Sequence, residues 1–359
     1  MLLGPRSFRA ATTMLALLAT GVLTGCAAIT PSPGATGTGV LLPNLSAAQA
    51  YRDGVARSES AIANASQSLV ILATECDLCR EVLQENAETA SERLSALGGL
   101  WRPWPDATES ELSELPMPDP VGEAPTRPAL LVAFMLLTAQ NQLAELPAVD
   151  GLSGAEASVI ASTLAGRILA AHTLAGFYDV DITQISKMLP EGALAGSVPP
   201  LTQPDADSPL PEETPTADQS GNDQQSGSTQ SGDTPSTEAH AAYHTFECAT
   251  TTLSFTDLVT TNPQMEATIF DAITERLVVL DTQGVGPDRE LRCVLDTTNT
   301  NELMAAIVGA DLQLVQSLEP PLQELGLTYL QADILRWRTI GTPPLVTPGL
   351  TLNDTAPSD

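Results

Sequence analysis

A long segment without aromatic residues divides this chain and limits how it can fold. From Gly196 to Glu238 the sequence reads GSVPPLTQPDADSPLPEETPTADQSGNDQQSGSTQSGDTPSTE, rich in Pro, Ser, Gln, Gly and acidic residues. Such a composition cannot bury enough apolar surface to offset the loss of chain entropy on folding. We therefore predict a disordered acidic linker at residues 191–237, long enough to separate two folded parts or to loop out from one.

The parts before and after this linker both show helical periodicity, with apolar residues every three or four positions. The sequence Ser153-Gly-Ala-Glu156 has the pattern of a capping box, and Gly98-Gly99 marks a helix end. Strand signals are short and isolated, so the predicted fold class is all-α. The predicted helices are Leu45–Thr74, Arg80–Leu97, Pro128–Leu146, Ser153–Gly176, Glu238–Val259, Asn262–Asp281, Thr300–Glu319 and Pro321–Arg338.

One six-residue pattern occurs on both sides of the linker. Glu92-Arg93-Leu94-x-x-Leu97 matches Glu275-Arg276-Leu277-x-x-Leu280, and AQNQL at 139–143 matches ADLQL at 310–314 in the same order. This order predicts a duplication, with helical module 1 at residues 44–190 and helical module 2 at residues 238–340. We expect the leucines of each copy to face the core and the Glu-Arg pair to be solvated.

The N-terminus, MLLGPRSFRAATTMLALLATGVLTGC, has two arginines, a short apolar run and small residues before a cysteine. This pattern predicts a secretory signal peptide at residues 1–25. The stretch from Leu23 to Cys26 resembles the bacterial lipobox, which implies that Cys26 is diacylated and anchors the protein in the membrane. An ordinary cleavable signal is the alternative. We expect a disordered tether at residues 26–43, a disordered tail at residues 341–359, and no later segment long and apolar enough to span a membrane.

The chain is strongly acidic. Removal of residues 1–25 would take away two arginines and no acidic residue, so the formal net charge would fall from −29 to about −31. Such a charge repels nucleic acid, so we exclude a nucleic-acid partner. Lys187 is the one lysine beside 14 arginines. With the abundant alanine and the lipobox, this bias indicates an extracytoplasmic lipoprotein of a high-GC Gram-positive bacterium.

Four cysteines remain besides Cys26, and an even number in an exported chain favours disulfides. Of the three possible pairings we prefer Cys76–Cys79 with Cys248–Cys293, because each bridge then stays within one module. The spacing CDLC also occurs in redox-active Cys-x-x-Cys motifs, but the neighbouring strand–helix pattern of such motifs is missing. A zinc site from the four cysteines is a further alternative, although the paired spacing that it needs occurs only once.

The sharpest metal-binding pattern is His240-x-x-x-His244-x-x-Glu247, whose three side chains share one helical face. A divalent metal is therefore an alternative to our expectation that the protein has no cofactor. We expect His172, on an apolar helix, to be a core residue. Trp101 and Trp104, in the segment LWRPWP, should pack across the end of a helical bundle, with a ligand or partner contact as the alternative. Trp337 should be buried.

Nothing in the sequence indicates catalysis. It contains no Gly-x-Ser-x-Gly elbow, no glycine-rich phosphate loop and no dinucleotide fingerprint, so we assign no catalytic residue and favour a protein that is not an enzyme.

The lipobox, the alanine-rich helices and the sequence ERLSALGG together resemble the exported ferritin-like lipoproteins of actinobacteria. The resemblance covers residues 45–180 and 238–340, and it implies two tandem ferritin-like four-helix modules. Neither module contains the Glu-x-x-His motif that a di-iron ferritin-like site requires, so a standard di-iron centre is excluded. We expect a non-enzymatic binding protein, or one that contacts an envelope partner. The alternatives are a metal-binding protein and an enzyme of unknown type.

Overall fold

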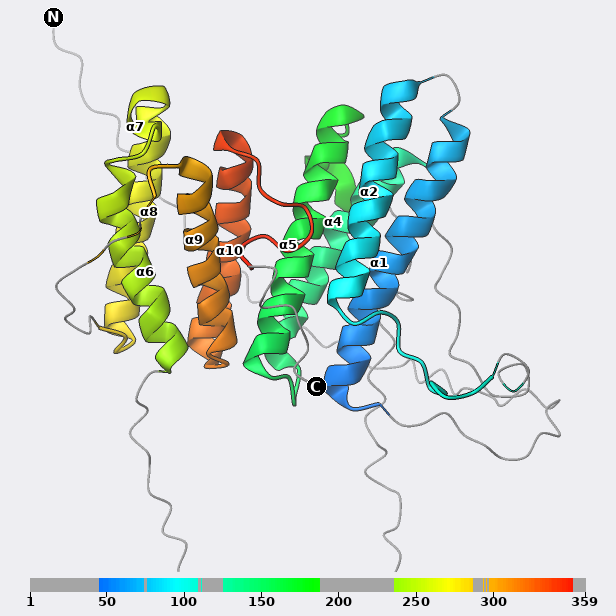
Figure 1. Cartoon of the computed structure of the whole chain (residues 1–359), viewed down its shortest axis with the longest axis horizontal. Coiled ribbons are helices and arrows are strands. Elements are labelled where there is room, and N and C mark those ends of the chain that lie inside the picture. Colours follow the sequence, from blue (N-terminus) through cyan, green and yellow to red (C-terminus); the bar gives the residue numbers. More distant parts are fainter. Residues whose placement is uncertain are drawn as a thin grey trace, which may run out of the picture. The chain divides into compact units, whose positions relative to one another are not determined.

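The computed structural model describes residues 45–73, 76–108, 111, 125–187, 236–286, 293, 295 and 297–350. The predicted signal peptide, the tether with Cys26 and residues 191–235 of the predicted linker lie outside these residues. The described parts are helical and contain no strand, so the prediction of an all-α fold is confirmed (Figure 1). The α-helices are α1 (Ala47–Leu72), α2 (Asp77–Ala96), α4 (Pro128–Glu145), α5 (Gly154–Phe177), α6 (Thr237–Leu253), α7 (Leu258–Thr261), α8 (Pro263–Thr282), α9 (Thr300–Gln316) and α10 (Pro320–Ile340). Two 3-10 helices, Leu146–Ala148 and Ile182–Lys187, follow α4 and α5.

The helix ends follow from local sequence. Ser46 and Ser153 each form a capping box, at the starts of α1 and α5. Proline occupies the first position of α4, α8 and α10, where its missing N–H has no helical partner. Gly98 follows α2 and Gly284 follows α8, each with φ of +83°, which ends the helix without a side-chain clash. The helices that carry the repeated motif therefore end by the same device.

The helices pack in two groups, and α5 of the first group also contacts the second group. In the first group α1 lies against α2 and α4, and α5 lies against α2 and α4. In the second group α9 lies between α6 and α10, and α8 packs on α6. Contacts of α5 with α9 and α10 join the groups into one compact unit. Nearly every side chain from Ala157 to Ala175 is buried, as expected for a helix with neighbours on all sides.

The expectation that no later segment is long and apolar enough to span a membrane was wrong for two helices. By length and composition alone, Pro128–Ala148 and Gly154–Phe177 are apolar enough to cross a membrane, each with a mean hydropathy of 1.3. Inside the protein, however, 61% and 78% of these windows are buried. Such burial is typical of core helices, and their apolar character is explained by the contacts of α4 and α5.

Residues 341–350, which we expected to belong to a disordered tail, pack against α5 and α9. Ser162 donates a hydrogen bond to the carbonyl oxygen of Pro348, at 2.8 Å, and the backbone N–H of Thr342 donates to Asn301, at 2.9 Å. Gly166 permits this approach: a Cβ atom there would lie 2.5 Å from the carbonyl oxygen of Val346. We call residues 341–350 the terminal strap. A segment rich in Pro and Gly can take up such an extended, packed position, and here that position depends on Gly166 in α5.

Candidate functional site

The arginine of each ERLxxL motif is buried, which corrects the prediction of a solvated Glu-Arg pair. Arg93 is 0% exposed and Arg276 is 2% exposed, whereas Glu92 and Glu275 lie at the surface. Adjacent residues on a helix point about 100° apart, so only one member of each pair can face the core. The predicted inward direction of the leucines holds for Leu97 and Leu280, at 3% and 0% exposure, whereas Leu94 and Leu277 are half-buried and pack against the core.

In the first helix group, one carboxylate holds two guanidinium groups. Glu59 on α1 accepts from Arg93 at 2.9 Å and from Arg167 on α5 at 2.7 Å, and all three side chains are fully buried. Arg167 also donates to Gln142, at 2.7 Å. Burial lowers the pKa of Arg167, and the charge of Glu59 opposes that effect. This Glu59 network joins α1, α2, α4 and α5 at the centre of the group.

In the second group one buried guanidinium faces two carboxylates, and one of these, Asp333, also pairs with the half-buried Arg336. Arg276 on α8 contacts Asp311 on α9, at 3.3 Å, and Asp333 on α10. Its guanidinium also lies 4.4 Å from the ring centroid of Tyr329, a cation–π contact. Burial and then the charge of Asp333 raise the pKa of Asp311 well above its usual range. Each buried charge in the two networks faces an opposite charge, although Nη2 of Arg93 and Oδ2 of Asp311 have no hydrogen-bond partner among the described residues. We interpret both networks as structural.

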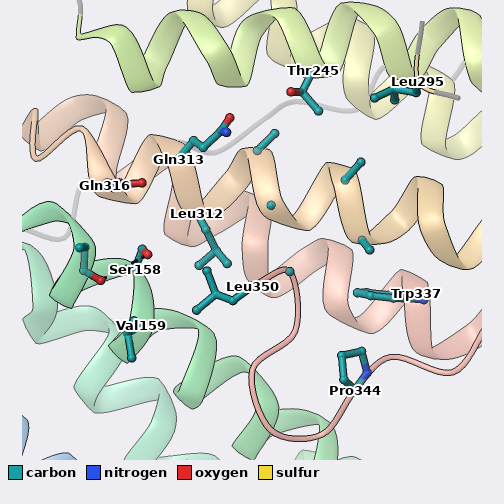
Figure 2. Close-up of a pocket in the computed structure, with 16 residues that line it drawn as sticks. Ser158, Val159, Thr245, Leu295, Leu312, Gln313, Gln316, Trp337, Pro344 and Leu350 are labelled. Carbon is teal, nitrogen blue, oxygen red and sulfur yellow. Dashed lines mark hydrogen bonds between the residues drawn. The ribbon is translucent and has the colours of Figure 1, made fainter. Parts of the chain in front are cut away.

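A cavity of about 680 Å³ lies where the two helix groups meet. Figure 2 shows Ser158 and Val159 of α5, Leu312 and Gln313 of α9, and Leu350 of the terminal strap around it. None of its lining residues is charged, although the chain has a formal charge of −29. The lining residues are Ala155, Ser158, Val159, Thr245, Leu295, Ala305, Ala306, Gly309, Ala310, Leu312, Gln313, Gln316, Trp337, Pro344, Gly349 and Leu350.

One polar atom at this cavity lacks a partner. The carboxamide oxygen of Gln313 is buried and accepts no hydrogen bond from the described residues. A buried acceptor without a donor costs free energy, about 1–3 kcal/mol, unless a ligand or water supplies the donor. Gln313 lines the cavity, so a bound molecule that reaches this oxygen could donate a hydrogen bond to it. The remaining lining offers hydroxyl groups and apolar surface, which suit binding more than acid–base catalysis.

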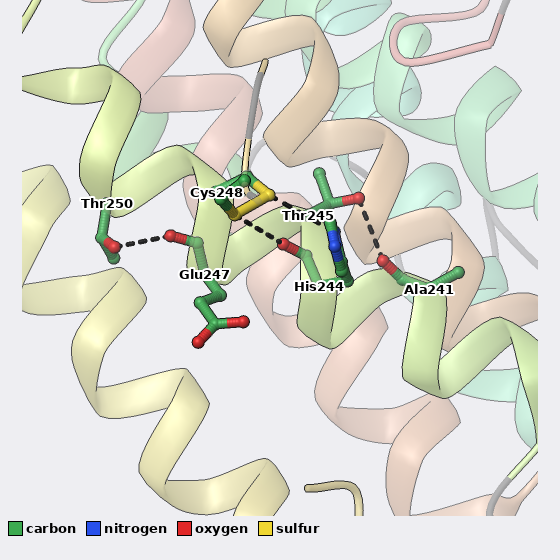
Figure 3. The surroundings of a disulfide bond; sticks show 7 residues. Ala241, His244, Thr245, Glu247, Cys248 and Thr250 are labelled. Carbon is green, nitrogen blue, oxygen red and sulfur yellow. Dashed lines mark hydrogen bonds between the residues drawn. A yellow bond between two sulfur atoms is a disulfide. The ribbon is translucent and has the colours of Figure 1, made fainter. Parts of the chain in front are cut away.

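The predicted metal ligands come together only in part. His244 lies beside the disulfide between Cys248 and Cys293, with Nδ1 3.3 Å from Sγ of Cys248 (Figure 3). His244, Cys248 and Cys293 are the one set of three potential metal ligands among the described residues, with ligand atoms within 4.8 Å of one another. His240 and Glu247 do not join it; Glu247 is exposed. While the disulfide is closed, its sulfurs are not thiolate ligands.

Both preferred disulfides are present, Cys76–Cys79 and Cys248–Cys293. They differ in the length of chain that they close. Loop-entropy arithmetic assigns about 4 kcal/mol to a bridge across 45 residues and about 2 kcal/mol to one across three residues. Cys248 is also 2% exposed, whereas Cys293 and both cysteines of the short bridge are half-buried. The long bridge is therefore expected to stabilise the folded state more than the short bridge does.

The other singled-out residues have ordinary surroundings. Trp101 and Trp104 are half-buried, and the backbone N–H of Trp101 donates to Asp53 on α1, at 2.8 Å. Trp337 is 3% exposed, as predicted, and its indole N–H donates to Asn301. His172 is half-buried rather than in the core. Burial, followed by the charge of Arg338, lowers its pKa.

Comparison of the chain with protein-family models, with curated proteins and with solved structures finds no match. Sequence reasoning missed the cavity, because its lining combines α5, α6, α9, α10 and the terminal strap. It also missed Arg167, for which a signal existed. A single arginine inside the apolar run ASTLAGRILAAH has to be buried with a counter-charge.

Proposed function

We propose that this protein is a lipid-anchored extracytoplasmic binding protein, and that its ligand site is the cavity between α5, α9 and the terminal strap. The observation that carries the proposal is a cavity of about 680 Å³ with a neutral lining. This volume is within the range of small-molecule sites. The ligand class is a small, uncharged molecule with apolar groups and one hydrogen-bond donor, because Gln313 offers a free buried acceptor.

The anchor and the ancestry belong to the same proposal. The lipobox sequence supports diacylation of Cys26, which would hold the cavity outside the cell membrane of a high-GC Gram-positive bacterium. The two helix groups support a duplicated pair of ferritin-like modules, since a buried arginine occupies the same motif position in each. An envelope partner that supplies or receives the ligand fits this placement.

The binding test uses two related fluorescent probes and the mature chain without its lipidated cysteine, residues 27–359. N-phenyl-1-naphthylamine is neutral, and 8-anilino-1-naphthalenesulfonate has a similar skeleton with one negative charge. We expect the neutral probe to bind at least about tenfold more tightly, because desolvating an unpaired charge is unfavourable. Ala306→Leu, which adds bulk inside the cavity, should weaken binding, and Ala241→Leu, at an exposed site on α6, should not.

Two results would refute the binding site. One is the absence of neutral-probe binding to folded protein, and the other is equal binding by wild type and Ala306→Leu. Localisation has its own test in the native host. Wild-type protein should fractionate with membranes and incorporate an alkyne-labelled fatty acid, whereas Cys26→Ser should lose the label. An unlabelled wild-type chain would refute the lipid anchor.

A further inference from the structure

The disulfide Cys76–Cys79 lies at the start of a long helix. Cys76 is the N-cap of α2, and its sulfur accepts a hydrogen bond from the backbone N–H of Cys79 at 3.2 Å. The unpaired N–H groups and the dipole at a helix N-terminus stabilise a thiolate. Asp77, inside the motif, is ion-paired with Arg80, which offsets the negative charge beside the sulfurs. Opening this bond would therefore leave Cys76 as a stabilised thiolate.

The surroundings of this bond are apolar and accessible. Ile71 is 71% exposed and Leu72 is 69% exposed, and both precede the bridge in sequence; Leu78, which lies between the two cysteines, is 57% exposed. Both cysteines also line a surface pocket of about 450 Å³. Its other lining residues are Leu69, Leu72, Ala73, Leu83, Thr126, Pro128 and Tyr178. We call the lining residues of this pocket, together with Ile71 and Leu78, the hairpin tip, because Cys76 and Cys79 lie where the chain passes from α1 into α2.

The second disulfide supplies the contrast. Cys248 is buried, although Cys293 is half-buried like Cys76 and Cys79, and the bridge closes a separation of 45 residues, so its loop length indicates a mainly stabilising role. The bridge at the hairpin tip closes a separation of three residues and constrains the unfolded chain far less. Three large apolar side chains at the surface around a weakly constraining disulfide are poorly explained by stability. They are explained by an apolar partner that reaches the sulfurs.

We propose that Cys76–Cys79 is a redox-active disulfide that oxidises pairs of cysteine thiols in apolar polypeptide segments. A substrate thiolate attacks Sγ of Cys79, the S–S bond breaks, and Cys76 leaves as a thiolate. The second substrate thiolate then attacks the substrate sulfur of the mixed disulfide and releases Cys79. The substrate loses two electrons and forms a disulfide, and the protein pair gains them. Of the two substrate thiol protons, one ends on Cys79 and the other passes to solvent, because Cys76 stays a thiolate.

This inference goes beyond the binding function proposed above. The hairpin tip and the cavity share no lining residue, so one site can fail its test while the other passes. The sequence spacing CDLC lacked the strand–helix context of redox motifs. The structure supplies the helix half of that context through the N-cap position of Cys76.

The experiment follows the two disulfides separately in the oxidised mature chain. The probe is a reduced synthetic peptide with two cysteines flanked by leucines, and a matched peptide carries glutamine in place of leucine. Samples are acid-quenched, alkylated, digested and analysed by mass spectrometry. We expect the leucine peptide to reduce Cys76–Cys79 at least about tenfold faster than Cys248–Cys293, with one peptide disulfide formed per bridge opened. Equal rates, or a resistant Cys76–Cys79 bridge, would overturn the proposal.

Substrate recognition is tested with two variants and a small dithiol. Leu78→Gln should slow the leucine peptide several-fold and leave the glutamine peptide unchanged. Val278→Gln replaces an apolar residue on α8 that is 61% exposed, and it should change neither rate. If dithiothreitol at an equal thiolate concentration opens the bridge as fast as the leucine peptide, or Leu78→Gln has no effect, the assignment of a polypeptide substrate is refuted.

Discussion

Replacing Glu59 with glutamine tests whether the Glu59 network holds the first helix group together. The substitution keeps the size of the side chain and removes the negative charge that faces Arg93 and Arg167. All three groups are 0% exposed, so water cannot replace the lost charge. Breaking one buried ion pair costs about 3–5 kcal/mol. Because both pairs share one carboxylate, the expected loss is at least that of one pair and less than twice it.

The assay is chemical and thermal unfolding followed by circular dichroism at 222 nm. The loss of one pair, about 3–5 kcal/mol, is the minimum expected and corresponds to a midpoint lower by about 6–20 °C. The matched control is Glu92→Gln, which removes an exposed carboxylate next to Arg93 in the same motif and should change stability by less than about 1 kcal/mol. If Glu59→Gln and Glu92→Gln differed by less than about 1 kcal/mol, the buried network would not be a stabilising centre.

Three further predictions concern other parts of the fold. Gly166→Ala should lower the free energy of unfolding by about 1–3 kcal/mol, because its Cβ would clash with the carbonyl oxygens of Leu345 and Val346. The control is Gly176→Ala on the same helix, whose Cβ would have its closest contact at 3.7 Å. It should raise the free energy of unfolding by up to about 1 kcal/mol in the same assay. Gly326→Ala, with a Cβ 2.7 Å from the carbonyl oxygen of Asp311, should separate α9 from α10 and lower the thermal midpoint, and an unchanged midpoint would contradict this. Because the folded pKa of Asp311 is raised, its favourable contribution is complete below the unfolded value of about 3.9 and is lost as pH rises through the folded pKa. The stability of Asp311→Asn relative to wild type should therefore increase over that window, whereas the exposed control Asp271→Asn should show no such trend.

The helices themselves were predictable from sequence, because their signals are local. The capping box at Ser153, the prolines at helix starts and the glycine at the end of α2 all act within one turn. Boundaries differed by a few residues. The helix expected from Arg80 begins at Asp77, where the sulfur of Cys76 serves as the cap. The disulfide pairing was predictable for a similar reason, since each bridge stays within one helix group.

The buried arginines were missed although the sequence contains their signal. Arg93 lies on one stripe with Ala90 and Leu97, both buried, at helical spacings of three and four. Arg276 occupies the same position between Ile273 and Leu280. The prediction of a solvated Glu-Arg pair was wrong because it rested on the charge of the two residues and ignored which face of the helix each one occupies. The phase of the flanking residues assigns each arginine to the core and predicts a buried counter-charge elsewhere.

The cavity could not be predicted, because no local pattern encodes it. Its wall includes Ser158 on α5 and Leu350 in the strap, which are 192 positions apart in the sequence. The strap reads as a tail by composition, since its prolines and glycines are typical of unstructured segments. Its place depends on a hydrogen bond donated by Ser162, on one accepted by Asn301, and on the absence of a side chain at Gly166.

The Glu59 network and the cavity are connected through the strap. Arg93, oriented by Glu59, donates from Nη1 to the carbonyl oxygen of Leu345, at 2.8 Å. Pro344, beside that carbonyl, and Leu350 line the cavity. Loss of the Glu59 charge would free Arg93 to leave Leu345, so one wall of the cavity would lose an anchor. Weaker probe binding by Glu59→Gln would therefore reflect a displaced strap, and only lining substitutions such as Ala306→Leu report on the ligand directly.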